Sequence, residues 1–329
     1  ADLGAEVIKV EPLAGDNTRR LLGSGAGFFG MFNRNKKSIA LDMKSARGRE
    51  IVLRLAAGAD VFSENFKSGT MERLDLGFEV LERLNPRLIH VSHKGFLPGP
   101  YEHRTALDEV VQMMGGLAYM TGPPGRPLRA GSSVNDIMGG LFGAIGVLAA
   151  LAQRERTGRG RQVQSALFEN NVLLMAQHMM QFAVTGRPAA PMPARISAWG
   201  LYDVFEVAGG EQIFLAAVSD TQWTLLCEAF GWSDLKDDAR LATNNDRVRA
   251  RDWLLPLLRE RFGGFEAAEL SARFERIGLP YAPIVRPHEL FDDPHLAATG
   301  GLAPVTLPAD ASGAGAPVET RLPLLPLAR

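Results

Sequence analysis

The chain has 329 residues, of which 46% are hydrophobic and 22% are charged, a balance typical of a soluble globular protein with a full hydrophobic core. The formal net charge of −1 gives no reason to expect nucleic acid or an anionic membrane as a partner. The single cysteine, Cys227, excludes an internal disulfide bond and favours a cytoplasmic location, and the histidines lack metal-ligand spacing, so no metal is expected.

The first part of the chain alternates between strand and helix patterns. The segment Ala5–Glu11 alternates into a short β-branched strand that stops at Pro12. A basic loop, a strand and a helix start follow within residues 32–44, and helical spacing then runs over residues 45–57. Further strands are predicted over residues 59–66, 87–92 and 162–167. This order predicts an α/β fold with a Rossmann-like parallel sheet, in which ligands gather at the carboxyl ends of the strands.

Three helical stretches accompany the last of these strands. One runs from Asp108 to Met120, and a Met-rich one covers residues 168–184. Between them, Ile137–Ala152 carries no charge but is shorter than the ~20 residues that a membrane span needs, so we expect a buried core helix. Its glycines, such as Gly139 and Gly143, lie four residues apart and predict the close approach of a neighbouring backbone.

The pattern changes after the proline-rich stretch Gly186–Pro193, which we interpret as a linker. An antiparallel hairpin is predicted over residues 201–218. Helices are then expected over residues 221–230, over 246–262 with a break or bend at Pro256, and over 267–277. We therefore expect a large α/β domain over residues 1–190 and a smaller α+β domain over residues 200–285. The expected third part, residues 286–329, returns to pack on the large domain.

Asp136 stands at the mouth of the uncharged helix. Ser132, Ser133, Asn135 and Asp136 are all residue types that start helices, so one interpretation of Asp136 is an N-cap. The functional alternative is a nucleophile, because a carboxylate beside an apolar wall is poorly solvated and more reactive toward an acyl carbonyl. The nearby helix N-terminus is expected to keep it ionised.

Asp108 is the second carboxylate of interest, and from the local pattern it is a helix-capping acid. Other residues also have ordinary interpretations. Asn65 and Phe66 fit a turn residue and a core residue, and Arg73 fits a solvated charge on a helix. The local pattern alone does not separate these interpretations from binding roles.

Three motifs together point to a family. Asp136 is followed by a Gly-rich helix, then by Arg154-Glu-Arg-Thr-Gly-Arg-Gly, and then by Gln162-Val-Gln-Ser. This arrangement resembles the class III CoA-transferases, the formyl-CoA and carnitinyl-CoA transferases and their relatives, and the match extends over nearly the whole chain. The resemblance implies that Asp136 is the acyl-accepting nucleophile. It also implies an interlocked homodimer, and a preceding strand and helix that lead into Ala1–Gly4.

The resemblance assigns coenzyme A contacts to a further set of residues. By it, Leu41, Asp42, Met43 and Lys44 line an adenine pocket, and Phe66 stacks on the purine. Asp108 lies near the active site and orients the acyl group or the CoA thiolate. The full implied CoA-binding set is Leu41, Asp42, Met43, Lys44, Asn65, Phe66, Arg73, Arg104 and Asp108.

The chain departs from the family pattern at three places. Pro12 stands where formyl-CoA transferase has an arginine. The stretch Ile196–Gly200 replaces a glycine-rich loop and contains one glycine. Leu107 stands where the related α-methylacyl-CoA racemases have a proton-transferring histidine, and leucine cannot carry a proton. The second departure indicates a different acid substrate or a different way of excluding water.

The predicted activity is transfer of coenzyme A from an acyl-CoA to a small free carboxylic acid, through an aspartyl mixed anhydride and an enzyme–CoA thioester. Acyl-CoA is then a substrate, and no permanently bound cofactor is expected. Backbone N–H groups near the Asp136 helix are expected to stabilise the oxyanions. The alternatives are a racemase-type isomerase and an inactive CoA-binding fragment. The sequence does not identify the donor or the acceptor acid.

Overall fold

The structure is a computed structural model that describes residues 1–309 and 315–326. The chain divides into two compact units. Unit 1 contains Ala1–Arg195 and Thr306–Thr320, and unit 2 contains Ile196–Val305 and Arg321–Arg329. The first boundary thus lies directly after the proline-rich stretch Gly186–Pro193.

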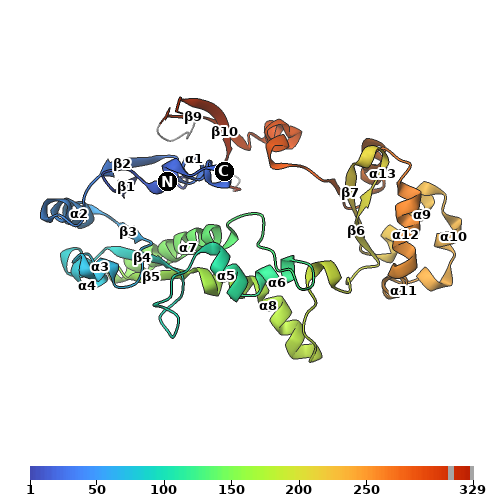
Figure 1. Cartoon of the computed structure of the whole chain (residues 1–329), viewed down its shortest axis with the longest axis horizontal. Helices are drawn as coiled ribbons and strands as arrows, with labels where there is room; N and C mark the ends of the chain where they lie inside the picture. Colours follow the sequence, from blue (N-terminus) through green and yellow to red (C-terminus); the bar gives the residue numbers. More distant parts are fainter. Residues whose placement is uncertain (310–314, 327–329) are drawn as a thin grey trace. The chain divides into compact units, whose positions relative to one another are not determined.

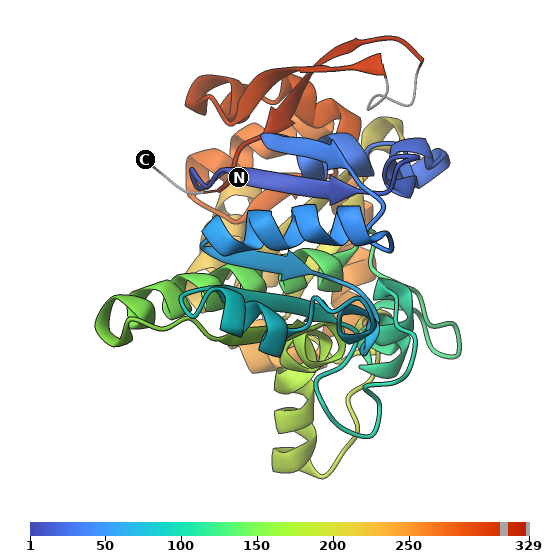
Figure 2. The same ribbon diagram turned by 90° about the vertical axis from the view of Figure 1, so that its left-hand side faces the viewer.

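Unit 1 is built on parallel strands in two sheets. One sheet pairs β1 (Val7–Glu11) with β2 (Lys36–Ala40). The other has the order β3 (Val61–Glu64), β4 (Ile89–Lys94) and β5 (Gln162–Ala166). All of these pairs are parallel, and Figure 2 shows the strands of both sheets running in the same direction. The predicted parallel α/β architecture is confirmed.

The helices of unit 1 connect and cover these strands (Figure 1). Ser45 caps the helix after β2 by accepting a hydrogen bond from the backbone N–H of Gly48. The helices are α1 (Phe28–Asn33), α2 (Ala46–Gly58), α3 (Thr70–Arg73), α4 (Phe78–Leu84), α5 (Asp108–Met114), α6 (Leu117–Thr121), α7 (Val134–Thr157) and α8 (Leu167–Thr185).

The helix predicted from Asp108 to Met120 is two helices, and the prediction of one continuous helix is wrong. Gly116 has a φ of +90°, a left-handed conformation that favours glycine and interrupts the helical path. At Gly115 a Cβ atom would lie 2.1 Å from Oδ1 of Asn171 on α8. The break therefore lets the chain pass close to α8 before α6 begins.

Helix α7 packs on β4, β5 and α8 through its glycines. A Cβ atom on Gly143 would lie 2.3 Å from Cε1 of His93, and one on Gly146 would lie 2.6 Å from Cγ1 of Val163. These glycines therefore provide the predicted close approach. Gly140, by contrast, has nothing within 4 Å of its would-be Cβ atom and faces open space.

The other face of α7 is open, so the prediction of a buried core helix is wrong for the single chain. Ile137, Leu141, Ile145 and Leu148 recur at helical spacing and are 39–58% exposed. Among the described residues, α7 is the one helix with the length and composition to cross a membrane, and 22% of its apolar window is buried. An uncharged helix can leave one apolar face uncovered, which composition alone does not reveal.

Unit 2 contains the antiparallel order β6 (Leu201–Glu206), β7 (Gln212–Ala217) and β8 (Tyr281–Pro283), which confirms the predicted hairpin. A single cluster of 20 buried residues, among them Phe205, Leu226 and Phe274, forms its core. Its helices are α9 (Asp220–Phe230), α10 (Ser233–Lys236), α11 (Asn244–Arg249), α12 (Arg251–Phe262), α13 (Ala267–Ile277) and α14 (Pro294–Thr299). Strands β9 (Leu302–Leu307) and β10 (Val318–Pro323) form a separate two-stranded sheet.

The break predicted at Pro256 lies elsewhere. Helices α11 and α12 are separated at Ala250, and Pro256 stands inside α12. The helix continues through the proline, with Leu254, Leu255 and Leu258 beside it buried in the core of unit 2. Burial of these leucines offsets the backbone hydrogen bond that the proline cannot donate.

Candidate active site

Asp136 is the third residue of α7, and its side chain is exposed in the chain. The N-cap position belongs to Ser133, whose side chain makes no capping hydrogen bond. Among the described residues, the carboxylate of Asp136 has no hydrogen-bond donor either. The N-cap interpretation of Asp136 is therefore wrong, and its carboxylate is free to meet another molecule.

Asp108 caps α7 from a different helix. Oδ1 of Asp108 accepts a hydrogen bond from the backbone N–H of Asn135 at 2.8 Å and from that of Asp136 at 3.3 Å. The N-cap of its own helix, α5, is Leu107, so the interpretation of Asp108 as a cap for its own helix is wrong. Asp108 precedes Asn135 by 27 residues and Asp136 by 28 residues, so the acceptor that fixes the first turn of α7 comes from a distant part of the sequence.

The neighbouring N–H groups of the same turn also have partners. The N–H of Val134 donates to the carbonyl of Ser132 at 2.9 Å, and that of Ile137 donates to the carbonyl of Ser133 at 3.0 Å. Together with the two bonds to Asp108, these contacts give a partner to each backbone N–H group of residues 134–137. Stabilisation of the oxyanions by backbone N–H groups near this helix stays a prediction, and residues 134–137 would have to exchange these partners to contribute to it.

The pKa of Asp136 is raised above its usual value. Although Asp136 lies at the surface, partial desolvation of its carboxylate by nearby protein atoms is the largest cause, repulsion from the Asp108 carboxylate is the second, and attraction to Arg129 opposes both. The first two causes act against the helix N-terminus, which was predicted to keep Asp136 ionised. A more basic carboxylate is a better nucleophile wherever it remains ionised.

Arg129, in the segment that leads into α7, pairs with two carboxylates of α5. Its Nη1 lies 2.5 Å from a carboxylate oxygen of Glu109, and its Nη2 lies 3.8 Å from Oδ2 of Asp108. Gln112, which is fully buried, donates to Asp108 and accepts from the N–H of Ala130 at 2.8 Å. Sequence reasoning missed Arg129 and Gln112, because nothing in their local pattern indicates these long-range contacts.

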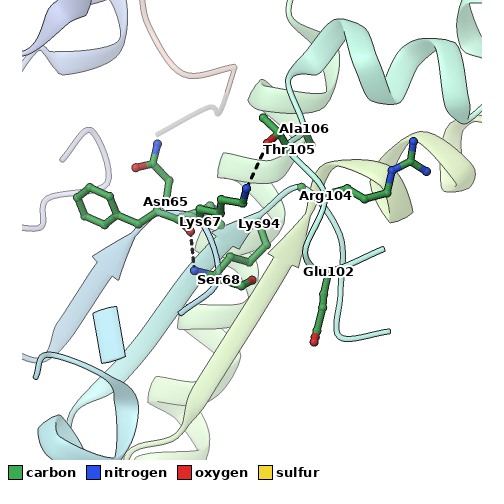
Figure 3. A pocket seen from close by; sticks show the side chains of 11 residues that line it. Asn65, Lys67, Ser68, Lys94, Glu102, Arg104, Thr105 and Ala106 are labelled. Carbon is green, nitrogen blue, oxygen red and sulfur yellow. Dashed lines mark hydrogen bonds between the residues drawn. The ribbon is translucent and has the colours of Figure 1, made fainter. Parts of the chain in front are cut away.

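A pocket of about 130 Å³ opens at the carboxyl ends of β3 and β4. It collects Asn65, Phe66 and Arg104 from the predicted CoA-binding set. Asp136 is not among its lining residues, but His93 is, and His93 packs against Gly143 of α7. The pocket is lined by Asn65, Phe66, Lys67, Ser68, His93, Lys94, Gly95, Glu102, Arg104, Thr105 and Ala106 (Figure 3).

Lys94 and Glu64 fix the floor of this pocket. Nζ of Lys94 lies 2.7 Å from Oε1 of Glu64 and donates to the carbonyl of Phe66 at 2.8 Å. The buried Glu64 carboxylate also accepts from the N–H of Phe66 at 2.8 Å. The Lys94 ammonium is thus paired within the protein, and it stabilises the turn that carries Asn65 and Phe66 at the pocket floor.

Lys67 is a pocket cation with a long hydrogen bond to a neutral group. It donates to the hydroxyl of Thr105 at 3.4 Å, across the pocket, as Figure 3 shows. The guanidinium of Arg104 lies 5.1 Å from the centre of the Tyr101 ring, and in Figure 3 the Arg104 side chain extends away from Lys67. Lys67 and Lys94 were both missed, although their places just after parallel strands are a signal that could have found them.

The remaining predicted CoA contacts lie outside the pocket lining. Leu41 and Met43 follow β2 and pack against the core cluster around Val52, Met71 and Leu76. Asp42 accepts from the N–H of Lys44 at 3.0 Å, and both residues are exposed. Arg73 is exposed on α3 and donates to the hydroxyl of Thr70 at 2.9 Å. These residues share the strand-end edge of unit 1, but the structure does not bring them into the pocket.

Comparison with known proteins identifies the family. The model of CoA-transferase family III matches residues 1–323. The chain is 35% identical over 304 residues to the acetyl-CoA:oxalate CoA-transferase of Acetobacter aceti, covering 90% of this chain and 78% of that enzyme. It is 34% identical over 306 residues to the succinyl-CoA:glutarate CoA-transferase of Mus musculus, covering 91% of this chain and 70% of that enzyme.

A solved structure agrees with this result. The crystal structure of a CAIB/BAIF family protein from Brucella suis superposes with a TM-score of 0.85 at 34% identity, covering all of this chain and 86% of that one. The resemblance seen in the motifs from Asp136 to Gln162 is thereby confirmed over the length of the chain. The chain belongs to CoA-transferase family III, and it is a CoA-transferase.

Proposed function

We propose that the protein moves coenzyme A from an acyl-CoA to a free carboxylic acid, with Asp136 as the covalent carrier. The observation that carries this proposal is the exposed carboxylate of Asp136, free of internal hydrogen bonds and more basic than usual, on a first turn held by Asp108. Relatives named as transferases for oxalate, glutarate and mesaconate support a short dicarboxylic acid as the acceptor.

The first half-reaction loads the enzyme. The Asp136 carboxylate attacks the thioester carbonyl of the donor, the C–S bond breaks, and a mixed anhydride and CoA thiolate form. The thiolate then attacks the Asp136 carbonyl of the anhydride and releases the donor as its free carboxylate. The product is a thioester between Asp136 and coenzyme A.

The second half-reaction reverses these steps with another acid. The acceptor carboxylate attacks the Asp136 thioester and displaces the thiolate, which gives a second mixed anhydride. The thiolate attacks the acceptor carbonyl, so the new acyl-CoA leaves and Asp136 is regenerated as a carboxylate. Each step exchanges one acyl bond for another of similar energy, so no nucleotide is consumed.

The pocket at the ends of β3 and β4 is the proposed CoA site. Phe66 is 39% exposed and presents a ring on which a purine can stack. Lys67, with its one long hydrogen bond to Thr105, is the cation best placed to meet a phosphate. Leu41–Lys44 and Arg73 remain proposed contacts for parts of coenzyme A that extend beyond the pocket.

The test combines a substrate panel with an Asp136 variant. Acetyl-CoA and succinyl-CoA are incubated with oxalate, glutarate and mesaconate, and new acyl-CoA is measured by chromatography. The parent protein should also yield a hydroxylamine-sensitive adduct of coenzyme A on Asp136. D136A should form neither product. Transfer by D136A at the parental rate would refute the covalent role of Asp136.

We also propose a homodimer that covers the open face of α7. Leu173, Met179 and Met180 of α8 are 57–64% exposed, in addition to the exposed stripe on α7. Apolar residues this numerous on two adjacent helices are typical of an interface between subunits. The interlocked form of this dimer remains a prediction from the family resemblance.

A further inference from the structure

We propose that Asp108 is a positioning residue whose carboxylate fixes the first turn of α7 and thereby holds Asp136 ready to attack. This inference rests on the proposed covalent role of Asp136. It assigns to Asp108 a task different from contact with the acyl group or the thiolate. Four contacts carry it: two backbone N–H groups of α7, the amide of Gln112 and the guanidinium of Arg129.

The hydrogen bonds around Asp108 fix the position of its carboxylate. The residue is 6% exposed, and a buried carboxylate is stable only with several donors around it. Gln112 is oriented by its bond to the N–H of Ala130, so its side-chain N–H₂ group faces Oδ2 of Asp108. Oδ1 is left for the N–H groups of Asn135 and Asp136. Each oxygen therefore has its own set of donors.

Helix α7 depends on this external acceptor. Ser133 at its N-cap makes no side-chain hydrogen bond, and among the described residues Asp108 is the side chain that accepts from the first turn. One of the two bonds is to the backbone N–H of Asp136 itself, so loss of Asp108 displaces the nucleophile directly. A displacement of about 1 Å is enough to lower a rate by roughly 10²-fold.

Asp108 also acts through its charge. Partial desolvation by the surrounding protein atoms raises the pKa of Asp136 most, the Asp108 carboxylate on α5 raises it further, and Arg129 lowers it. Glu109 on α5 pairs with Arg129 and weakens its effect. An aspartate whose pKa is raised loses its nucleophilic form as the pH falls through that raised value. The acid limb of kcat/KM should therefore report the charge at position 108.

The test compares D108N with D108A. D108N removes the charge but keeps an oxygen that can accept from α7, so the acid limb of kcat/KM should move to lower pH with a loss in kcat of roughly tenfold. D108A removes both the charge and the acceptor, and kcat should fall by roughly 10²-fold or more. Amide hydrogen exchange at Asn135 and Asp136 should accelerate in D108A.

Two further variants separate positioning from general destabilisation. In D108N the new amide faces the amide of Gln112, and the double variant D108N/Q112E restores a donor–acceptor pair there, so part of kcat should return. D246N alters a helix-terminal aspartate of unit 2, which accepts from Thr243, and should leave kcat and the acid limb unchanged.

The outcomes distinguish the inference from the function on which it rests. If the parent transfers coenzyme A while D108N and D108A keep its kcat and acid limb, the positioning role is wrong. If the parent protein transfers no coenzyme A, the proposed function is wrong. In that case amide exchange still tests the capping of α7, and unchanged exchange at Asn135 and Asp136 in both D108N and D108A would overturn it. If D108A does not fold, D108N and D108N/Q112E decide the inference. A shift of the acid limb in D108N together with a partial return of kcat in D108N/Q112E supports it, and the absence of both overturns it.

Discussion

The two units bury their apolar residues in different ways. Unit 2 gathers 20 buried residues into one cluster, whereas the clusters of buried residues in unit 1 contain three residues each, around Val52 and Ala56. Unit 1 instead leaves apolar residues of α7 and α8 exposed. The difference indicates that unit 2 is stabilised from within, whereas unit 1 leaves an apolar face that the proposed homodimer would cover.

The largest expected effect is on the core of unit 2. Phe274 is fully buried and F274A should lower the free energy of unfolding by about 3–5 kcal/mol, because the cavity cannot be filled. Phe182 on α8 is 52% exposed, and F182A should cost less than about 1 kcal/mol in the dissociated chain. Urea unfolding measures the free energy of unfolding of both variants. An equal loss in F274A and F182A would contradict the difference between the two units.

The second effect concerns assembly through α7. Ile145 is 58% exposed, and I145E would place a charge in the proposed interface. The dissociation constant of the dimer should rise by roughly 100-fold, equivalent to about 2.7 kcal/mol, which light scattering over a dilution series can measure. L225E, at a residue of unit 2 that is 37% exposed, is the control. A dimer unaffected by I145E would place the interface elsewhere.

A smaller effect is expected in thiol labelling. Burial raises the pKa of Cys227 to about 12, so the native thiol should react slowly at pH 8. L148C, on the open face of α7, should label at least about tenfold faster in the dissociated chain and slow down on assembly. Labelling of Cys227 at the rate of a free thiol would show that the core of unit 2 opens readily.

The smallest effect is on the stability of D136A. The Asp136 carboxylate accepts no internal hydrogen bond and repels Asp108, so its removal should change the free energy of unfolding by less than about 0.5 kcal/mol. Loss of a true N-cap aspartate would instead lower the free energy of unfolding by about 1 kcal/mol. Because the folded-state pKa is raised, the parent should lose stability relative to D136A as the pH rises through that value. Urea titrations at several pH values measure the trend.

Periodicity and motif spacing predicted the parallel α/β architecture of unit 1 and the hairpin of unit 2, but not every helix boundary. The strands and the unit 2 hairpin follow from residues near in sequence, and so does the position of Asp136 at a helix start. The capping of α7 by Asp108 and the places of Gln112 and Arg129 depend on contacts between distant segments. No local pattern encodes such contacts.

The exposed face of α7 shows a second limit. A run of apolar residues indicates that a face is shielded from water. It does not indicate whether the same chain or another molecule covers that face. The glycines of α7 illustrate the point, since Gly143 and Gly146 face the sheet while Gly140 faces open space. Identical residues in one helix therefore have different surroundings that spacing alone does not separate.

The contact between Gly143 and His93 has a consequence for engineering. His93 lines the pocket, and its ring stands where a methyl group on residue 143 would be. A G143A substitution, made on the far side of the pocket wall, must displace either the imidazole or α7. The methyl group added by G143A would thus alter the width of the pocket without a substitution of any residue that lines it.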